Sequence, residues 1–295
     1  MALGYATSID RAMTDLSIII VNWNTRELLA QCLQSVYDTW HGSGLEVFTV
    51  DNASTDGSAD MVRGHFPAVR LIENETNVGF AGANNQAIQA SRGRYILLLN
   101  PDTEVHPGAL DTLLGFMKDH TQASAAGPQL LNPDGTLQPS CHPAPTLFRE
   151  LWRLFHLDAV RPYGRYDMAD WERDTSREVD TVKGACMMVR REALDQVGLL
   201  DEDYYMYTEE LDLCYRLRKN GWKVYWIPQA TVTHHGGQST RQVAAEMFLH
   251  LYRSKVLYFR KQHGPRAAGA YKLILLATAL ARLMISPLAS LEGPE

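Results

Sequence analysis

The feature that most constrains the fold is an unbroken apolar run in the first half of the chain. Five apolar or aromatic residues, Tyr95–Leu99, are followed directly by Asn100-Pro101-Asp102. A run with no polar alternation is typical of a strand buried on both faces of a parallel or mixed sheet. The strand must end at Pro101, because proline cannot donate a backbone hydrogen bond and restricts the residue before it. We therefore expect Asp102 just beyond the carboxyl end of a central strand.

The position of Asp102 allows two interpretations. Ligands of open α/β sheets bind at the carboxyl ends of the strands, and a carboxylate there can hold a divalent cation against phosphate oxygens. Alternatively, Asp102 caps the helix that is expected after Pro107. The apolar run does not decide between the two, so the decision depends on the other motifs of the chain.

Strand-like and helix-like segments alternate along the first third of the chain. Apolar, β-branched runs at residues 16–22, 45–50 and 69–72 indicate buried strands. Between the first two, apolar residues recur at helical spacing over residues 28–40, and Thr25 is placed to cap that helix. This alternation predicts an α/β fold with a central, mostly parallel sheet and right-handed crossovers.

The rest of the chain continues with shorter elements. A second Asn-Pro-Asp, at residues 132–134, is followed by glycine, which favours a hairpin turn over a ligand site. Residues 138–178 are aromatic and proline-containing, and we expect an insertion that lines one side of a cleft. One further helix is expected to end near residue 66, and others are expected over residues 81–90, 110–120, 190–197 and 209–219, the last capped by Thr208. Further strands are expected over residues 182–189, 224–227 and 230–233.

The composition limits the class of protein. A chain of 295 residues, 45% of them hydrophobic, is large enough for one big domain, with or without an appendage. Its formal net charge of -6 does not indicate the basic surface that is typical of nucleic-acid-binding proteins, so no nucleic-acid partner is expected. The four cysteines lie far apart, without the paired spacing of a zinc site, and we expect buried free thiols in a reducing cytosol.

The two ends of the chain differ from the part between them. Residues 1–14 lack a long apolar core, so we expect a flexible leader without a secretory signal, followed by a domain over residues 15–240. Residues 241–295 combine a basic helical segment with an apolar one that Arg282 and Pro287 interrupt. Such a region suits an anionic membrane surface better than a membrane span. The alternative is a C-terminal helix packed on the domain.

Polar side chains gather at the ends of successive predicted strands. A nucleotide is bound by such groups: carboxylates and amides for the base and ribose, glycine for close backbone approach, and helix N-termini for phosphate. Any one of them is equally typical of a helix cap, but four successive strand ends are difficult to explain by capping alone. The residues are Asn22, Asn24, Asp51, Asn52, Asn77, Gly79, Asn100 and Asp102.

Two further motifs carry candidate catalytic groups. Glu209, Glu210 and Asp212 place three carboxylates within four residues. They indicate either ordinary first-turn acidity on a solvated helix face, with Asp212 paired to Arg216, or a general base at the edge of a cleft. The histidine pair at residues 234–235 precedes two glycines, and one imidazole can complete a metal site with Asp102, although an isolated histidine pair is more often structural.

Over about residues 16–240, the chain resembles the GT-A-type family-two inverting glycosyltransferases. It is most similar to their rhamnosyltransferase-like branch, which carries Asn-Pro-Asp where relatives carry Asp-x-Asp. The resemblance implies the GT-A fold of nucleotide-diphospho-sugar transferases: a central, mixed but mostly parallel sheet flanked by helices, here with a C-terminal helical extension. It rests on the ordered segments VNWN, VDNASTDGS, NVGFAGANN, LLLNPD, VKGACMMVRREAL, YTEELDLCYR and THHGG.

The resemblance implies a role for each matching position. Asp51 would bind the nucleobase beside the backbone of Val21 and Asn22, and Gly184-Ala185 would face the donor sugar. Asp102 would hold Mg²⁺ or Mn²⁺ on the diphosphate, with His234 preferred over His235 as a second ligand. Glu210 would be the base, with Glu209 as the runner-up. The nucleotide pocket would further include Asn24, Asn77, Gly79, Asn84 and Asn100.

The implied activity is the inverting transfer of a sugar from a nucleotide-sugar donor, such as dTDP-L-rhamnose or another dTDP- or UDP-deoxysugar, to a glycan or polyprenyl-linked acceptor. This suits synthesis of cell-surface polysaccharide at the inner, cytoplasmic face of the cell membrane, and self-association of the chain stays open. Asn100 replaces a carboxylate of the relatives, so the cation would depend on oxygens of the donor. The competing functions are a sugar nucleotidyltransferase and a noncatalytic nucleotide-sugar-binding module.

Overall fold

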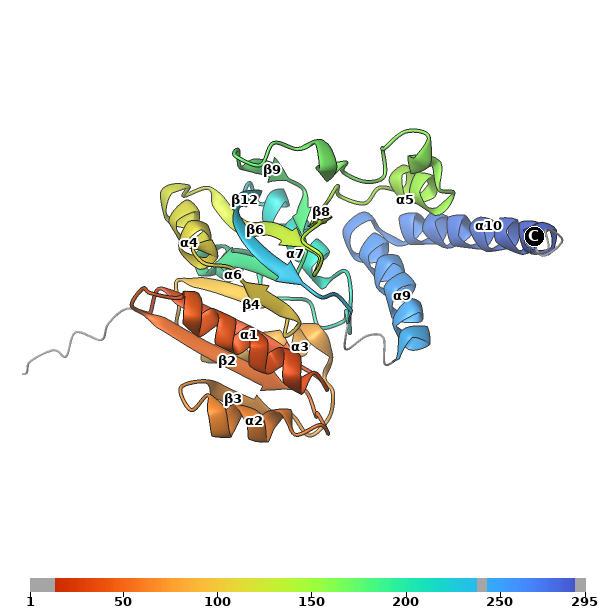
Figure 1. Ribbon diagram of the computed structural model, residues 1–295. Helices are drawn as coiled ribbons and strands as arrows, with labels where there is room; N and C mark the ends of the chain where they lie inside the picture. Colours follow the sequence, from red (N-terminus) through yellow and green to blue (C-terminus); the bar gives the residue numbers. More distant parts are fainter. Residues whose placement is uncertain (1–13, 238–242, 290–295) are drawn as a thin grey trace, which may run out of the picture.

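The computed structural model describes residues 14–237 and 243–289, so all but one residue of the expected leader lies outside the described part (Figure 1). The strands are β1 (Leu16–Asn22), β2 (Leu45–Asp51), β3 (Arg70–Glu73), β4 (Tyr95–Leu99), β5 (Thr103–Val105), β6 (Ala123–Leu131), β7 (Leu137–Gln138), β8 (Cys141–His142), β9 (Arg177–Val179), β10 (Thr181–Val182), β11 (Cys186–Arg190) and β12 (Lys223–His234). The α-helices are α1 (Arg26–Thr39), α2 (Ser58–His65), α3 (Gly79–Ala90), α4 (Ala109–Asp119), α5 (Leu147–Leu154), α6 (Arg191–Val197), α7 (Glu209–Lys219), α9 (Ala244–His263) and α10 (Pro265–Ala289).

A mixed sheet forms the centre of the protein. In the described part of the chain its strand order is β3-β2-β1-β4-β11-β6-β12-β5, with β7 added beside β6 and β9 beside β12. The first four strands are parallel, as the alternation of strands and helices predicts, and β11 joins β4 in the antiparallel direction. Helices α1, α2 and α4 cover one face, and α3, α6 and α7 cover the other. The predicted α/β architecture is therefore confirmed.

Strand β4 is the central strand that the apolar run predicts. All five of its side chains are buried, and the strand lies between β1 and β11. Leu97 and Leu99 pack into the core on one face of the sheet, while Ile96 and Leu98 pack into the core on the other. Asp102 follows the strand at its carboxyl end. It does not cap the next helix, because β5 intervenes and α4 begins after Gly108.

Two of the expected strand boundaries are wrong. The strand expected over residues 182–189 is broken, because the backbone of Lys183 bonds to Ser140 while that of Ala185 bonds to Asn100 at the edge of β4. The chain passes there from the small β8–β10 sheet into the main sheet. The two strands expected over residues 224–233 form one strand, β12. It absorbs a proline in its interior through a register shift between Ile227 and Thr231.

The two expected threonine caps are also wrong. Thr25 precedes α1, but its hydroxyl donates to Asn22 Oδ1 at 2.6 Å instead of accepting from the helix backbone. Thr208 precedes α7 in the left-handed conformation, with φ of 77°, and makes no side-chain cap bond. In both cases the threonine stands at the predicted N-cap position but makes no cap hydrogen bond. Asn22 takes the hydroxyl proton of Thr25. The left-handed backbone of Thr208 differs from the extended conformation that is typical of an N-cap residue.

The C-terminal helices pack on the insertion and, through α9, on α7 of the main domain, as the alternative interpretation predicts. Helices α9 and α10 share a core with α5 that contains Leu154, Tyr258, Phe259 and Tyr271. Beyond this contact α10 extends away from the body of the protein (Figure 1). Its segment Pro265–Met284 is long and apolar enough to cross a membrane, and only 17% of its most apolar window is buried.

A close backbone contact joins α3 to the loop that precedes α7. Phe80 N–H donates to the carbonyl oxygen of Tyr205 at 2.9 Å. Gly79 has a φ of +81°, and a Cβ at this position would lie 2.6 Å from that same oxygen. Glycine is therefore required at this site both for its backbone conformation and for space.

We expect Gly79→Ala to lower the free energy of unfolding by about 3 kcal/mol, of which about 1 kcal/mol is backbone strain and the rest is steric. Gly108→Ala is the matched control, because Gly108 has a φ of +78° but no described atom within 4 Å of the point that a Cβ would occupy. Gly108→Ala should lower the free energy of unfolding only by the strain contribution, about 1 kcal/mol. Urea unfolding measures both, and equal losses would contradict the close contact.

Candidate active site

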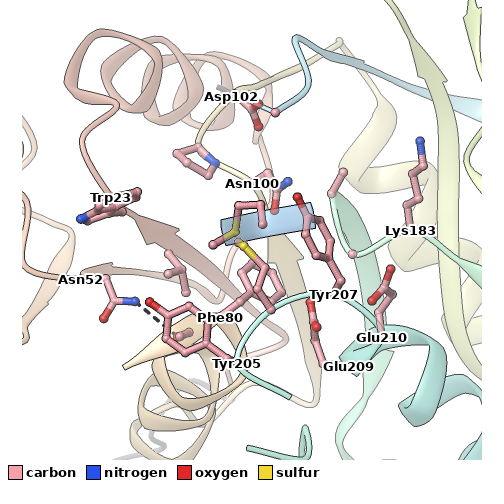
Figure 2. A pocket seen from close by; sticks show the side chains of 18 of the residues that line it. Trp23, Asn52, Phe80, Asn100, Asp102, Lys183, Tyr205, Tyr207, Glu209 and Glu210 are labelled. Carbon is pink, nitrogen blue, oxygen red and sulfur yellow. Dashed lines mark hydrogen bonds between the residues drawn. The ribbon is translucent and has the colours of Figure 1, made fainter. Parts of the chain in front are cut away.

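A cavity of about 500 Å³ opens at the carboxyl ends of the central strands (Figure 2). One wall comes from the ends of β1, β2 and β4 with the start of α3, and the other comes from the β10–β11 connection, the start of α7 and the start of α9. Its lining residues are Val21, Trp23, Asn52, Asn77, Gly79, Phe80, Asn100, Pro101, Asp102, His142, Lys183, Gly184, Ala185, Tyr205, Met206, Tyr207, Glu209, Glu210, His234, Gly237, Val243, Glu246 and Met247.

Asn52 organises the wall where α3 begins. Its Nδ2 donates to Asn77 Oδ1 at 2.7 Å, and its Oδ1 accepts from Asn74 Nδ2 and from Val78 N–H, both at 3.1 Å. These bonds fix the turn that leads into Gly79 and the N-terminus of α3. Helix N-termini attract anions, so this wall suits a phosphate-bearing ligand.

Four of the expected nucleotide-pocket residues do not line the cavity, because other protein groups occupy their side chains. Asp51 is 4% exposed and accepts from Asn22 Nδ2 at 3.1 Å and from Ser54 N–H at 2.9 Å. Asn24 Oδ1 accepts from Thr55 N–H at 2.8 Å. Asn84 is buried in α3, where its Nδ2 donates to the Phe80 carbonyl at 2.9 Å. Asp51 and Asn22 lie just behind the cavity wall, one residue from Asn52 and Val21 respectively.

Asp102 and His234 meet at one end of the cavity. His234 Nε2 lies 3.3 Å from Asp102 Oδ1 and 3.4 Å from Asn100 Nδ2, and the side chains of Asp102 and His234 are both buried. The pairing of β5 with β12 brings these distant segments together. His235 points elsewhere, with its Nε2 2.8 Å from Glu104 Oε1.

The donor set at this end fits a weakly held divalent cation. A carboxylate oxygen and an imidazole nitrogen are both metal ligands. Among the described residues no group of three or more His, Cys, Asp or Glu side chains is arranged for a metal. A cation held by these two side chains alone would take most of its ligands from water and from phosphate oxygens of a substrate, which is the usual arrangement for Mg²⁺ at phosphate sites.

Glu209 and Glu210 lie on the opposite wall, at the first turn of α7. The two residues before the helix, Tyr207 and Thr208, both have left-handed backbone conformations, which direct the first turn of α7 toward the cavity. One carboxylate oxygen of each glutamate, Oε2, is buried and has no hydrogen-bond partner among the described residues. The interpretation as a solvated helix face is therefore wrong for these two residues.

Burial raises the pKa of both glutamates above the ordinary value. The charge of Glu210 raises the pKa of Glu209 further, whereas backbone hydrogen bonds and the nearby ammonium groups of Lys183 and Lys255 lower that of Glu210. Two neighbouring buried carboxylates favour a state in which one of them keeps a proton, and Glu210 is the one that the ammonium groups of Lys183 and Lys255 act on. Figure 2 shows Glu210 and Lys183 on the same side of the pocket.

Asp212 pairs with Arg216, as the alternative interpretation predicts, but it lies in the interior and not on a solvated face. Its Oδ2 accepts from Arg216 Nε at 2.7 Å, one helical turn on, and its side chain is fully buried. Tyr204 and Gln262 donate to its other oxygen.

Several lining residues were missed by the sequence reasoning. Lys183 lies next to Gly184 in a recognised motif, and Trp23 lies inside VNWN, so both motifs contained the signal. Tyr205 and Tyr207 lie four and two residues before Glu209, the first residue of the acidic cluster. The wall from α9, with Val243, Glu246 and Met247, had no such signal, because helical periodicity does not say against which surface a helix packs. The insertion expected along the cleft contributes His142 among the described lining residues.

Comparison with known proteins identifies the family. Residues 17–198 match the family model of glycosyl transferase family 2. The chain belongs to this family. It is therefore a glycosyltransferase, and the expected resemblance is confirmed. A nucleotidyltransferase or a noncatalytic module is not supported.

Two relatives illustrate the range of the family. An N-acetylglucosaminyl-diphospho-decaprenol L-rhamnosyltransferase of Mycobacterium tuberculosis is 33% identical over 235 residues, covering 74% of this chain and 76% of the relative. The low-salt glycan biosynthesis hexosyltransferase Agl10 of Haloferax volcanii is 29% identical over 212 residues, covering 70% and 62%.

Solved structures confirm the GT-A fold of this family 2 glycosyltransferase. A Pyrobaculum calidifontis mannosyltransferase in complex with GDP-Man and Mn²⁺ aligns with a TM-score of 0.57 at 18% identity, over 94% of this chain and 79% of that one. GalNAc-T7 with UDP, GalNAc and Mn²⁺ aligns with a TM-score of 0.58 at 16% identity, over 76% and 44%. At these identities the likeness concerns the fold alone.

The raised pKa of Glu209 predicts how stability depends on pH. The folded protein keeps a proton that the unfolded chain, with the ordinary value of 4.5, loses. Stability must therefore fall as the pH rises above about 4.5. We expect Glu209→Gln to raise the free energy of unfolding by about 1–2 kcal/mol at pH 8 and to leave it unchanged at pH 4.

Urea unfolding at both pH values measures this effect. Glu246→Gln is the control, because Glu246 also lines the cavity but is exposed, and its effect should be small at both pH values. A difference between Glu209→Gln and the wild type that does not change with pH would contradict the buried proton.

Proposed function

We propose that this glycosyltransferase moves a sugar from a nucleoside diphosphate donor to a hydroxyl group of a lipid-linked glycan, with inversion, and that Glu210 is the general base. The observation that carries the proposal is the pair of buried carboxylates facing Asp102 and His234 across one cavity. A diphosphate bound near Asp102 would place the anomeric carbon between the two walls. The acceptor hydroxyl would then approach from the side of α7.

The nucleotide is proposed to bind along the wall formed by the ends of β1 and β2. Trp23 offers an aromatic face, and Asn52 and Asn77 offer amide groups near the N-terminus of α3. Asp51 supports this wall from behind through Asn22. Gly184 and Ala185, on the opposite wall, leave room for the donor sugar, and a Cβ on Gly184 would first meet the side chain of Glu210, at 3.6 Å.

Asp102 and His234 would hold Mg²⁺ or Mn²⁺, which when bound offsets the negative charge on the departing nucleoside diphosphate. The protein's own contribution lies on the other wall. Glu210 takes the proton of the acceptor hydroxyl, whose oxygen bonds to the anomeric carbon as the bond to the diphosphate breaks. Attack from the face opposite the leaving group inverts the configuration, and no sugar–enzyme bond forms.

The identity of the base follows from the electrostatics of the pair. Glu209 is the more buried of the two residues, at 5% exposed, whereas Glu210 is of intermediate exposure. The ammonium groups of Lys183 and Lys255 act on Glu210 and favour its ionised form against the effect of burial. A base must be unprotonated before it acts. Glu210 is therefore the base and Glu209 a buried acid beside it.

The substrates are proposed from the relatives. The mycobacterial relative is named as an L-rhamnosyltransferase acting on a diphospho-decaprenol, so L-rhamnose from a dTDP or UDP donor and a polyprenyl-linked acceptor are the proposed substrates here. The cavity is compatible with an acceptor of this kind because one wall belongs to α9. That helix leads directly into α10.

Helix α10 is proposed to lie on the cytoplasmic face of the cell membrane. Leu273, Leu276, Leu280 and Leu283 recur at helical spacing and are each at least half exposed. Exposed basic side chains accompany them on the same two helices, including Arg253, Arg260, Arg266 and Lys272. An apolar face with flanking basic residues is typical of binding to an anionic surface. The acceptor's lipid would remain in that membrane while its sugar enters the cavity.

Glu210→Gln should lower the transfer rate by about 10³-fold, because the amide cannot accept the proton. Donor binding should persist, since the change is isosteric and lies on the acceptor side; thermal stabilisation by the nucleoside diphosphate with Mn²⁺ measures this. Glu209→Gln is the matched control and should lower the rate far less. Unchanged transfer by Glu210→Gln with bound donor would remove the base assignment.

The triple variant Leu276→Gln, Leu280→Gln, Leu283→Gln should no longer float with vesicles that contain anionic lipid, whereas the wild type should. All three residues are exposed, so folding should be unaffected. Val78→Gln, an exposed apolar position on the sheet side of the molecule, serves as the control. Equal flotation of the wild type and the triple variant would exclude this face as the membrane contact.

A further inference from the structure

The hairpin with the second Asn-Pro-Asp, residues 132–134, has no role in the reaction described so far. It joins β6 to β7 and is closed by backbone bonds from Asn132 N–H to the Thr136 carbonyl at 2.8 Å and from Gly135 N–H to the Asn132 carbonyl at 2.9 Å. Its second strand places Gln138 directly against His234. The hairpin therefore reaches the cation end of the cavity from behind.

A chain of hydrogen bonds with a fixed direction runs through this hairpin. The Asp134 carboxylate accepts from the Thr136 hydroxyl at 2.6 Å, and these contacts with Thr136 lower the pKa of Asp134, so it acts only as an acceptor. Because the Thr136 hydroxyl has donated its one proton, it must accept from Asn132 Nδ2, at 2.9 Å. That bond orients the Asn132 amide, so that its Oδ1 faces Gln138.

The orientation of the Gln138 amide follows from the same chain. Its Nε2 donates to Asn132 Oδ1 at 2.9 Å and to the His234 carbonyl oxygen at 3.0 Å. Both partners are acceptors, so the amide cannot be flipped. Gln138 Oε1 therefore faces His234 Nδ1, at 2.6 Å. An amide oxygen cannot donate, so Nδ1 must carry a proton.

The tautomer of His234 is thereby fixed. With its proton on Nδ1, the neutral ring presents the lone pair of Nε2 to the cavity, 3.3 Å from Asp102 Oδ1. The same contact prevents rotation of the ring. Histidine ligands of metals are commonly held in this way, with the second nitrogen donating to a protein oxygen.

We propose that Gln138 is a positioning residue for the divalent cation: through its contact with His234 Nδ1, and with its own amide held by Asn132, Thr136 and Asp134, it directs His234 Nε2 at the cation. This inference rests on the proposed function, because it takes Asp102 and His234 as the ligands. The hairpin motif thus has a role in the reaction without contact with the substrate.

The experiment uses the full chain and Mn²⁺ alone, with no sugar donor. Binding is measured from the electron paramagnetic resonance signal of free Mn²⁺, and the tautomer of His234 is read from imidazole ¹⁵N NMR shifts of the metal-free protein. We expect Gln138→Met to weaken Mn²⁺ binding about 10- to 100-fold and to shift the tautomer away from the Nδ1–H form. Gln129→Met is the matched control on the same hairpin, because Gln129 faces Arg173 instead, and it should change neither.

Asp102→Asn separates failure of the inference from failure of the proposed site. If Asp102→Asn weakens Mn²⁺ binding while Gln138→Met does not, the site stands and the role of Gln138 is overturned. If Asp102→Asn has no effect, the proposed cation site itself is wrong. Should Gln138→Met fail to fold, Gln138→Ala tests the same contact by removing the amide, and an unchanged His234 tautomer in that variant would overturn the proposal.

Discussion

The arrangement of the site depends on one buried ion pair, Asp212 with Arg216. Asp212 is completely buried, and such a charge is stable only when its oxygens are fully paired. Arg216 Nε donates to it at 2.7 Å, and the remaining guanidinium nitrogens donate to the carbonyls of residues 197–199, at the C-terminal end of α6. Gln262 of α9 donates to the other oxygen at 2.6 Å. One carboxylate thus ties α7 to α6 and to α9, and so fixes the first turn of α7 in the cavity wall.

Much of the fold could be predicted because apolar runs and strand ends are local features. The buried run of β4, its termination before Asp102 and the parallel order of the first strands all follow from sequence pattern. What failed was the partnership of polar groups. Asn22 and Asp51 both stand at strand ends, as expected, but they bond to each other across neighbouring strands. The sequence does not distinguish an asparagine whose side chain binds a ligand from one whose side chain hydrogen-bonds to a neighbouring residue.

The acidic cluster shows the same limit from the other side. The spacing of Asp212 and Arg216 indicated an ion pair, and the structure contains it. Glu209 and Glu210 have no cation one turn on that pairs with them in this way, so the spacing allowed both a solvated face and a catalytic pair. Only the left-handed turn at Tyr207 and Thr208 aims them into the cavity. Backbone conformations of this kind are rare for residues other than glycine and cannot be read from the residue types.

The C-terminal helices also influence the electrostatics of the site. Lys255 of α9 is held by Glu150 of α5, with its Nζ 2.7 Å from Glu150 Oε1, and Arg153 and Tyr271 donate to the other oxygen of that glutamate. The ammonium group is thereby kept in the interior, where it lowers the pKa of Glu210. The insertion and the C-terminal helices therefore do more than cover the sheet. In the proposed reaction they favour the ionised form of the base. Because α10 follows α9 directly, the surface proposed to face the membrane adjoins the wall proposed to receive the acceptor.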